Sequence, residues 1–318
     1  MTHTPEDPLA AGAAPGGVPD DAPQLPVFVV NESAGSAPSV LAAIEPEEEA
    51  GRLELRVCAS GKKTRKTLRE VAEGGARRIV VCGGDGTVRN AVNTLRERLD
   101  RVEIGIVPAG TGNDFARSLR LPERPAAAAR LAIEGSVRRV DVLELEGVKK
   151  PLVLNCINGG IGAVASAGLS PASKRMFGPL AYWAAALAEI MSPPRLELSF
   201  EVDDRHFELI AHGFAIANGR TVGGGFSLAP DIMLDDGLFD LLALPVQPVS
   251  ETILEAIGSL LGRDELPQGV LHVRGARCRV RAPAPFATSV DGDVTERTDL
   301  KVRLHPGLAS FVCEPPRG

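Results

Sequence analysis

Residues 80–90, Val-Val-Cys-Gly-Gly-Asp-Gly-Thr-Val-Arg-Asn, decide how the rest of the chain is interpreted. The β-branched run at 78–82 predicts a strand buried on both faces, which three glycines around Asp85 then end. These glycines allow a sharp turn and let the backbone approach a ligand closely. The N–H groups of the following helix, which we expect Thr87 to cap, would point at that turn and attract phosphate. Asp85 would repel a bare phosphate, so its presence predicts a metal ion or a hydroxyl to be positioned.

A second glycine loop follows the next predicted strand, at 104–108. Residues 108–117 read Pro-Ala-Gly-Thr-Gly-Asn-Asp-Phe-Ala-Arg and lead into a short predicted helix. By itself this stretch is also compatible with an ordinary capped helix start. Neighbouring parallel strands, however, would bring both loops to the same carboxyl edge of the sheet, where open α/β folds bind ligands.

The pattern of predicted strands and helices changes near residue 140. Between 25 and 140, strand, loop and helix alternate, which predicts an α/β domain with parallel strands. From 141 to 318, short alternating or β-branched stretches predict a β-rich domain, a sandwich or an open barrel. A hairpin turn is predicted at Asp203–Asp204, and the stretches are 153–158, 196–202, 207–217, 238–244, 270–281 and 300–304. Helices are expected at 64–73, 125–134, 177–191 and 251–261. Residues 1–24 are rich in Pro, Ala, Gly and Asp, so we expect a disordered tail.

Composition excludes several classes of protein. The 318 residues are 44% hydrophobic and 24% charged, which is typical of a globular chain. The formal net charge of −6 gives no global basic field for nucleic acid. Five cysteines stand singly, which favours reduced thiols over a disulfide framework. No apolar run reaches the length of about 18 residues that a membrane-spanning helix needs, and the N-terminus lacks a signal-peptide pattern. We therefore expect a cytoplasmic protein.

The ordered motifs together resemble the lipid kinases of the diacylglycerol kinase catalytic type. This group includes soluble bacterial diacylglycerol kinases and the sphingosine and ceramide kinases. Gly-Gly-Asp-Gly-Thr at 83–87 and Gly-Thr-Gly-Asn-Asp-Phe-Ala-Arg at 110–117 carry the resemblance. It continues through residues 223–240, which contain Gly-Gly-Gly, Leu-Ala-Pro and Asp-Asp-Gly, and ends with Val-Asp-Gly-Asp at 290–293. It thus covers the chain from about Leu25 to the C-terminus.

The resemblance implies a fold and a reaction. The fold would be a phosphofructokinase/NAD kinase-like α/β domain followed by a β-sandwich-rich C-terminal domain, with the active site in the cleft between them. The extreme C-terminus could pack back on the first domain. The reaction would be ATP-dependent transfer of the γ-phosphoryl group to a lipid hydroxyl, with diacylglycerol as the leading acceptor and phosphatidic acid as product. The partner would be a lipid substrate at the membrane surface, visited transiently from the cytoplasm.

Roles for individual residues follow from the same resemblance. Asp291 would be the general base, with Asp85 also catalytic. Asp236, with the carbonyls of Met233 and Leu238, would hold a structural Mg²⁺. The nucleotide would be bound by residues of both glycine loops and their surroundings: Asn31, Gly83, Gly84, Asp85, Gly86, Thr87, Asn90, Thr111, Asn113 and Asp293.

Two departures from the family pattern bear on these roles. Asn31-Glu32 stands where the family usually has Asn-Pro, and Asp293 stands where it usually has Glu. Rival interpretations are an NAD kinase or sugar kinase of the same superfamily, and a catalytically inactive relative that binds lipid or nucleotide. The acceptor could also be phosphatidylglycerol, a sphingoid base or an isoprenoid alcohol, and a homodimer remains open.

Overall fold

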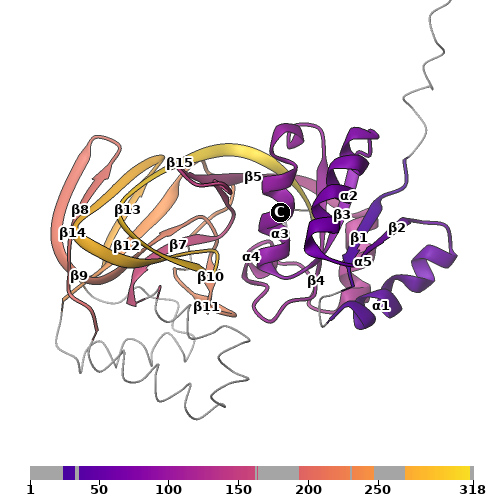
Figure 1. Cartoon of the computed structure of the whole chain (residues 1–318), viewed down its shortest axis with the longest axis horizontal. Helices are drawn as coiled ribbons and strands as arrows, with labels where there is room; N and C mark the ends of the chain where they lie inside the picture. Colours follow the sequence, from indigo (N-terminus) through magenta and orange to yellow (C-terminus); the bar gives the residue numbers. More distant parts are fainter. Residues whose placement is uncertain are drawn as a thin grey trace, which may run out of the picture.

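The computed structural model describes residues 24–32, 36–161, 163, 193–229, 231–246 and 269–315. Within them, an α/β part is followed by a β-rich part, as predicted, and the two lie side by side (Figure 1). The helices expected at 177–191 and 251–261, and almost all of the predicted tail, lie outside the described residues. No described helix is both long enough and apolar enough to cross a membrane.

The α/β part is built on a parallel sheet in the order β2-β1-β3-β4. Alternate residues of its strands face opposite layers of helices, because successive side chains of a strand point to opposite faces. Val27, Val29 and Ile79 pack in the same core as α2 and α3, whereas Phe28 and Val80 pack with α1 and α5. The elements are β1 (Val27–Asn31), α1 (Ala37–Glu49), β2 (Glu54–Cys58), α2 (Gly61–Glu73), β3 (Arg78–Gly83), α3 (Asp85–Thr94), η1 (Arg96–Arg98), β4 (Glu103–Pro108), α4 (Asp114–Ser118) and α5 (Pro125–Glu134).

The β-rich part is mostly antiparallel. Strands β8, β9, β7 and β14 pair in a closed circuit, and β12 and β13 extend it from β9. The β8–β9 hairpin turns at Asp203–Asp204, as predicted. Its core contains Phe200, Phe214 and Phe286, whose rings meet edge to face. The elements are β6 (Leu152–Val153), β7 (Cys156–Gly160), β8 (Leu196–Val202), β9 (Arg205–Ala217), β10 (Thr221–Val222), β11 (Phe226–Ser227), β12 (Phe239–Pro245), β13 (Leu271–Gly275) and β14 (Arg277–Val290).

Two long strands join the parts. β5 (Ser136–Leu145) and β15 (Asp293–Cys313) run antiparallel to each other and cross from one part to the other (Figure 1). β15 pairs with β14 in the β-rich part, and its far end pairs in parallel with β4 at Ser310 and Phe311. The boundary predicted at 140/141 therefore falls inside β5, and one continuous sheet passes through both parts.

Candidate functional site

The two glycine loops touch each other through their backbones. The first loop (Gly83–Thr87) joins β3 to α3, and the second loop (Ala109–Asn113) joins β4 to α4. A Cβ on Gly110 would lie 2.5 Å from the Cα of Gly84, which is closer than any side chain tolerates. The Asn113 amide holds the second loop, because its Oδ1 accepts from the Gly110 N–H at 2.8 Å and its Nδ2 donates to the Gly110 carbonyl at 2.9 Å. Only glycine permits this contact.

Helix α3 starts inside the first loop, one turn earlier than expected. Gly84 occupies the N-cap position with no side-chain cap, so the prediction that Thr87 caps the helix is wrong. Thr87 is instead the third helical residue, and its own N–H donates to the Gly84 carbonyl. Its side chain also fills the space beside Gly83, where an added Cβ would lie 2.6 Å from the Thr87 Cβ. The helix therefore starts at Asp85, and the N–H groups of Asp85 and Gly86 are the first-turn donors at the loop.

Two aspartates connect the loops to their neighbours. Half-buried Asp85 accepts the Phe115 N–H of α4 at 3.0 Å through Oδ1. Asp114, which is buried, accepts the N–H groups of Gly224 and Gly225 at 2.8–3.0 Å and so ties α4 to the β10–β11 turn. Burial raises the pKa of Asp114, the two amide hydrogen bonds lower it, and the nearby Asp85 raises it further. The sequence motifs alone do not predict this role of Asp114.

The β14–β15 turn brings Asp291 to the same region from the β-rich part. Asp291 and Gly292 both have positive φ, 45° and 95°, as a tight two-residue hairpin turn requires. The Asp291 side chain is only 3% exposed. Its Oδ1 accepts from the N–H groups of Asn155 (3.1 Å) and Cys156 (3.0 Å), and its Oδ2 accepts from Leu154 N–H (3.1 Å). Asp293, just after the turn, has a side chain that is 79% exposed.

These features enclose a cavity of about 530 Å³ between the two parts of the molecule. Eight of the predicted residues line it: Gly84, Asp85, Gly86, Thr87, Asn90, Thr111, Asp291 and Asp293. Residues of the second loop, the start of α4, β7 and the residue before it, β10 and the turn after it, and the β14–β15 turn complete the wall: Gly112, Asp114, Asn155, Cys156, Asn158, Val222, Gly223, Gly224 and Gly292.

Three predicted nucleotide residues stand behind this lining. Gly83 and Asn113 shape the two loops, as described above. Asn31 ends β1 at the same carboxyl edge of the sheet, because the preceding Val30 pairs with Cys82 of β3. The loop after Asn31 lies partly outside the described residues.

The cavity is rich in carboxylates, whose oxygens are the ligands that Mg²⁺ prefers. Asp85, Asp114, Asp291 and Asp293 line it together. Among the described residues, no three acidic, histidine or cysteine side chains come close enough to hold a metal by themselves. A cation here fits best as a companion of phosphate groups, which would supply its remaining oxygen ligands.

The structural Mg²⁺ predicted at Asp236 and the carbonyls of Met233 and Leu238 stays a prediction. The Asp236 carboxylate already has partners: one oxygen accepts the Leu238 N–H at 3.1 Å, and the other forms an ion pair with Arg274. A cation at Asp236 would therefore compete with the Arg274 guanidinium.

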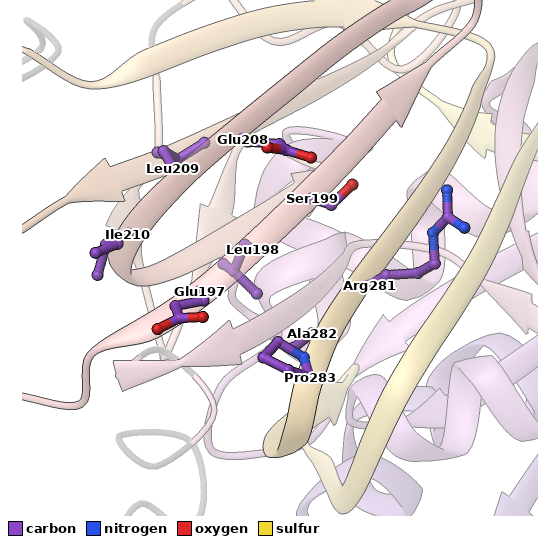
Figure 2. A pocket seen from close by; sticks show the side chains of 9 residues that line it. All are labelled: Glu197, Leu198, Ser199, Glu208, Leu209, Ile210, Arg281, Ala282 and Pro283. Carbon is purple, nitrogen blue, oxygen red and sulfur yellow. The ribbon is translucent and has the colours of Figure 1, made fainter.

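A second cavity, of about 500 Å³, lies on the β-rich part (Figure 2). Its lining comes from β8, β9 and β14 and includes Leu198, Leu209 and Pro283. None of the predicted site residues borders it. The chemistry suggested by the motifs is therefore concentrated in the cavity between the two parts.

Comparisons with known proteins match the α/β part and the β-rich part to two separate domain families. Residues 26–145 match the profile of the diacylglycerol kinase catalytic domain, and residues 155–313 match that of the YegS C-terminal NAD kinase beta sandwich-like domain. A Pseudomonas aeruginosa protein named "Probable lipid kinase YegS-like" is 31% identical over 288 residues, which span 87% of this chain and 93% of the relative. The diacylglycerol kinase of Bacillus subtilis is 32% identical over 216 residues, 68% of this chain and 70% of that enzyme.

A solved structure shares the fold. The crystal structure of a diacylglycerol kinase from Bacillus anthracis superposes with a TM-score of 0.71 at 22% identity, covering 92% of this chain and 97% of that one. The predicted fold class is therefore confirmed. The chain belongs to the lipid kinase family that joins a diacylglycerol kinase catalytic domain to a YegS-type β-sandwich domain.

Proposed function

We propose that this protein transfers the γ-phosphoryl group of ATP to a lipid hydroxyl, with diacylglycerol as the first acceptor to test and phosphatidic acid as the product. The observation that carries the proposal is the cavity in which two touching glycine loops face carboxylates of the β-rich part. Phosphoryl transfer needs mainly positioning and charge stabilisation, and both loops offer backbone N–H groups for that purpose. The lipid kinase family of the chain supports a lipid acceptor.

In this proposal the first loop binds the nucleotide phosphates. Gly86 leaves room for close backbone approach, and the N–H groups at the start of α3 favour negative charge. Thr87, Asn90 and Thr111 offer side-chain hydrogen bonds along the cavity wall. Bound with the nucleotide, Mg²⁺ would supply the positive charge that offsets the phosphates, and Asp293 has the oxygen chemistry to hold it.

A carboxylate is the expected proton acceptor for the lipid hydroxyl. Resemblance implied Asp291, but both of its oxygens already accept backbone N–H groups and its side chain is nearly inaccessible. To take a proton there, the lipid hydroxyl would have to displace one of these bonds. Asp85 is half-buried, and its Oδ1 accepts the Phe115 N–H. We therefore favour Asp85 as proton acceptor and Asp291 as the residue that holds the turn.

The decisive experiment offers purified protein radiolabelled ATP together with diacylglycerol micelles, NAD or fructose 6-phosphate in separate reactions. We expect label in the lipid fraction, and an Asp85→Asn variant should lose it while still folding. Label that passed only to NAD or to the sugar would overturn the lipid assignment. Nucleotide binding without turnover on any lipid in a membrane extract would instead indicate an inactive relative.

A further inference from the structure

Arg89 lies on α3, one turn beyond the first loop, and is buried between the two parts of the molecule. Its side chain is only 8% exposed. The guanidinium donates to three backbone carbonyls: Nε to Leu152 at 3.2 Å, Nη1 to Val290 at 3.1 Å, and Nη2 to Lys150 at 3.1 Å. Arg89 therefore joins α3 to the β5–β6 connection, to the start of β6 and to the end of β14.

The same guanidinium contacts both acids of the β14–β15 turn. Nη1 donates to Asp293 Oδ2 at 3.1 Å, and Nε lies 3.7 Å from Asp291 Oδ2. One helical turn later on α3, the amide side chain of Asn93 also binds the backbone of Leu152. Its Oδ1 accepts the Leu152 N–H at 3.0 Å, and its Nδ2 donates to the Leu152 carbonyl at 2.8 Å. One face of α3 is thus fixed to the β-rich part by polar contacts of buried or half-buried groups.

These contacts matter because α3 starts inside the first loop, which we propose binds phosphate. Asp85 and Gly86, at the start of the helix, line the cavity, and so do Asp291 and Asp293 of the turn. We propose that Arg89 is a positioning residue that holds the β14–β15 turn at a fixed place beside the first glycine loop. The inference deepens the proposed kinase function, on which its catalytic consequence rests.

Arginine suits this task better than lysine. Its planar fork carries five donors in fixed directions, so a single side chain can hold carbonyls and carboxylates from several segments at once. A lysine keeps the charge but has only a compact ammonium group on a flexible stem. Burying a charge is costly unless it is fully paired, and here the carbonyls and carboxylates that pair with Arg89 all come from the β-rich part of the chain.

Arg89 also influences the charge of Asp291. Burial raises the pKa of Asp291, whereas Arg89 and the three backbone N–H groups lower it. From β7, the Cys156 thiol faces Asp291, and burial keeps its pKa well above the ordinary value, so the thiol stays neutral near pH 7. From β15, Asp293 lies on the other side of the guanidinium. Removing Arg89 should therefore raise the pKa of Asp291 further.

The test compares wild type, Arg89→Met and Arg89→Lys by thermal unfolding, with Arg96→Met as control for loss of an exposed arginine. We expect Arg89→Met to lower Tm by about 5–10 °C. Arg89→Lys keeps the charge but not the planar fork, so it should restore little of this loss. An Arg89→Met loss no larger than that of Arg96→Met, or a wild-type Tm in Arg89→Lys, would overturn the proposal.

Lipid phosphorylation by the same proteins provides the second readout. Displacing the turn by about 1 Å should lower kcat by roughly 10- to 100-fold, with a smaller change in KM for ATP. Full kcat in a folded Arg89→Met protein would also overturn the proposal. The thermal measurement needs no substrate, so it decides the role of Arg89 even where wild type phosphorylates no lipid, the outcome that contradicts the proposed function alone.

Discussion

Replacing Gly110 by alanine is expected to force the two glycine loops apart. The added Cβ would lie 2.5 Å from the Cα of Gly84 and 2.9 Å from Oδ1 of Asn113. Non-bonded carbon atoms settle at about 3.5–4.0 Å, so the loops must separate by roughly 1 Å. Overpacking of this kind costs about 1–3 kcal/mol, which corresponds to a loss of about 2–6 °C in Tm for a chain of this size.

The Gly86→Ala variant is the matched control. Gly86 also lines the cavity, but a Cβ there would meet nothing within 4 Å, and its φ is not in the left-handed region. Because Gly86 is helical, alanine should stabilise the fold by about 0.5–1 kcal/mol. Comparing the two variants separates the effect of loop contact from that of adding a methyl group near the phosphates.

Calorimetric Tm and ATP affinity by isothermal titration are the two assays. We expect Gly110→Ala to lose both stability and ATP affinity, and turnover to fall by up to about 100-fold because a displacement of about 1 Å misaligns the reacting groups. A Gly110→Ala protein with the Tm and the ATP affinity of wild type would refute the idea that contact between the loops shapes the nucleotide site.

Three further predictions concern charged side chains. Asp114→Ala leaves the Gly224 and Gly225 N–H groups without their acceptor, at a cost of about 1–3 kcal/mol each. Tm should therefore fall, and KM for a substrate should rise. An unchanged KM would show that the β10–β11 turn does not contribute to substrate binding. Asp85→Asn should lower kcat by about 10²- to 10⁴-fold at nearly constant Tm, and the assignment of proton acceptor fails if Asp291→Asn alone behaves that way. Arg274→Met should expose Asp236 to Mg²⁺, so the Tm of this variant should depend on Mg²⁺. The Tm of wild type without nucleotide should differ by less than about 1 °C between EDTA and Mg²⁺. A clear Mg²⁺ dependence of wild-type Tm would show instead that a cation competes with Arg274.

Local sequence patterns predicted the elements that carry strong periodicity. The helix at Pro125–Glu134 and the strand at Leu196–Val202 have the predicted bounds. Helix α1 was missed because Pro46 and several glutamates obscure its apolar face, of which Val40 and Ile44 are buried. β15 was predicted only at residues 300–304, since its register shifts between His305 and Ala309 and much of its first half is exposed.

The glycine loops could be predicted from the sequence because the residues that define each loop are close together in the chain. Three glycines around Asp85 signal a close backbone approach, whichever residue lies opposite. The partner, Gly110, could be inferred only through the rule that parallel strands share an edge. Arg89 and Asp114 gave no such signal, because their contacts join residues far apart in the chain, such as Arg89 with Val290 and Asp114 with Gly224. Roles of this kind depend on tertiary geometry.

The return of β15 to β4 has a consequence for biosynthesis. Until Ser310 and Phe311 leave the ribosome, β4 remains an unpaired edge of the parallel sheet, although all four strands of that sheet are complete some 200 residues earlier. An open edge is a template for wrong pairing with other chains. We therefore expect nascent chains that stop short of residue 310 to aggregate or recruit chaperones, and the proposed nucleotide site to form only once Ser310 and Phe311 have emerged from the ribosome.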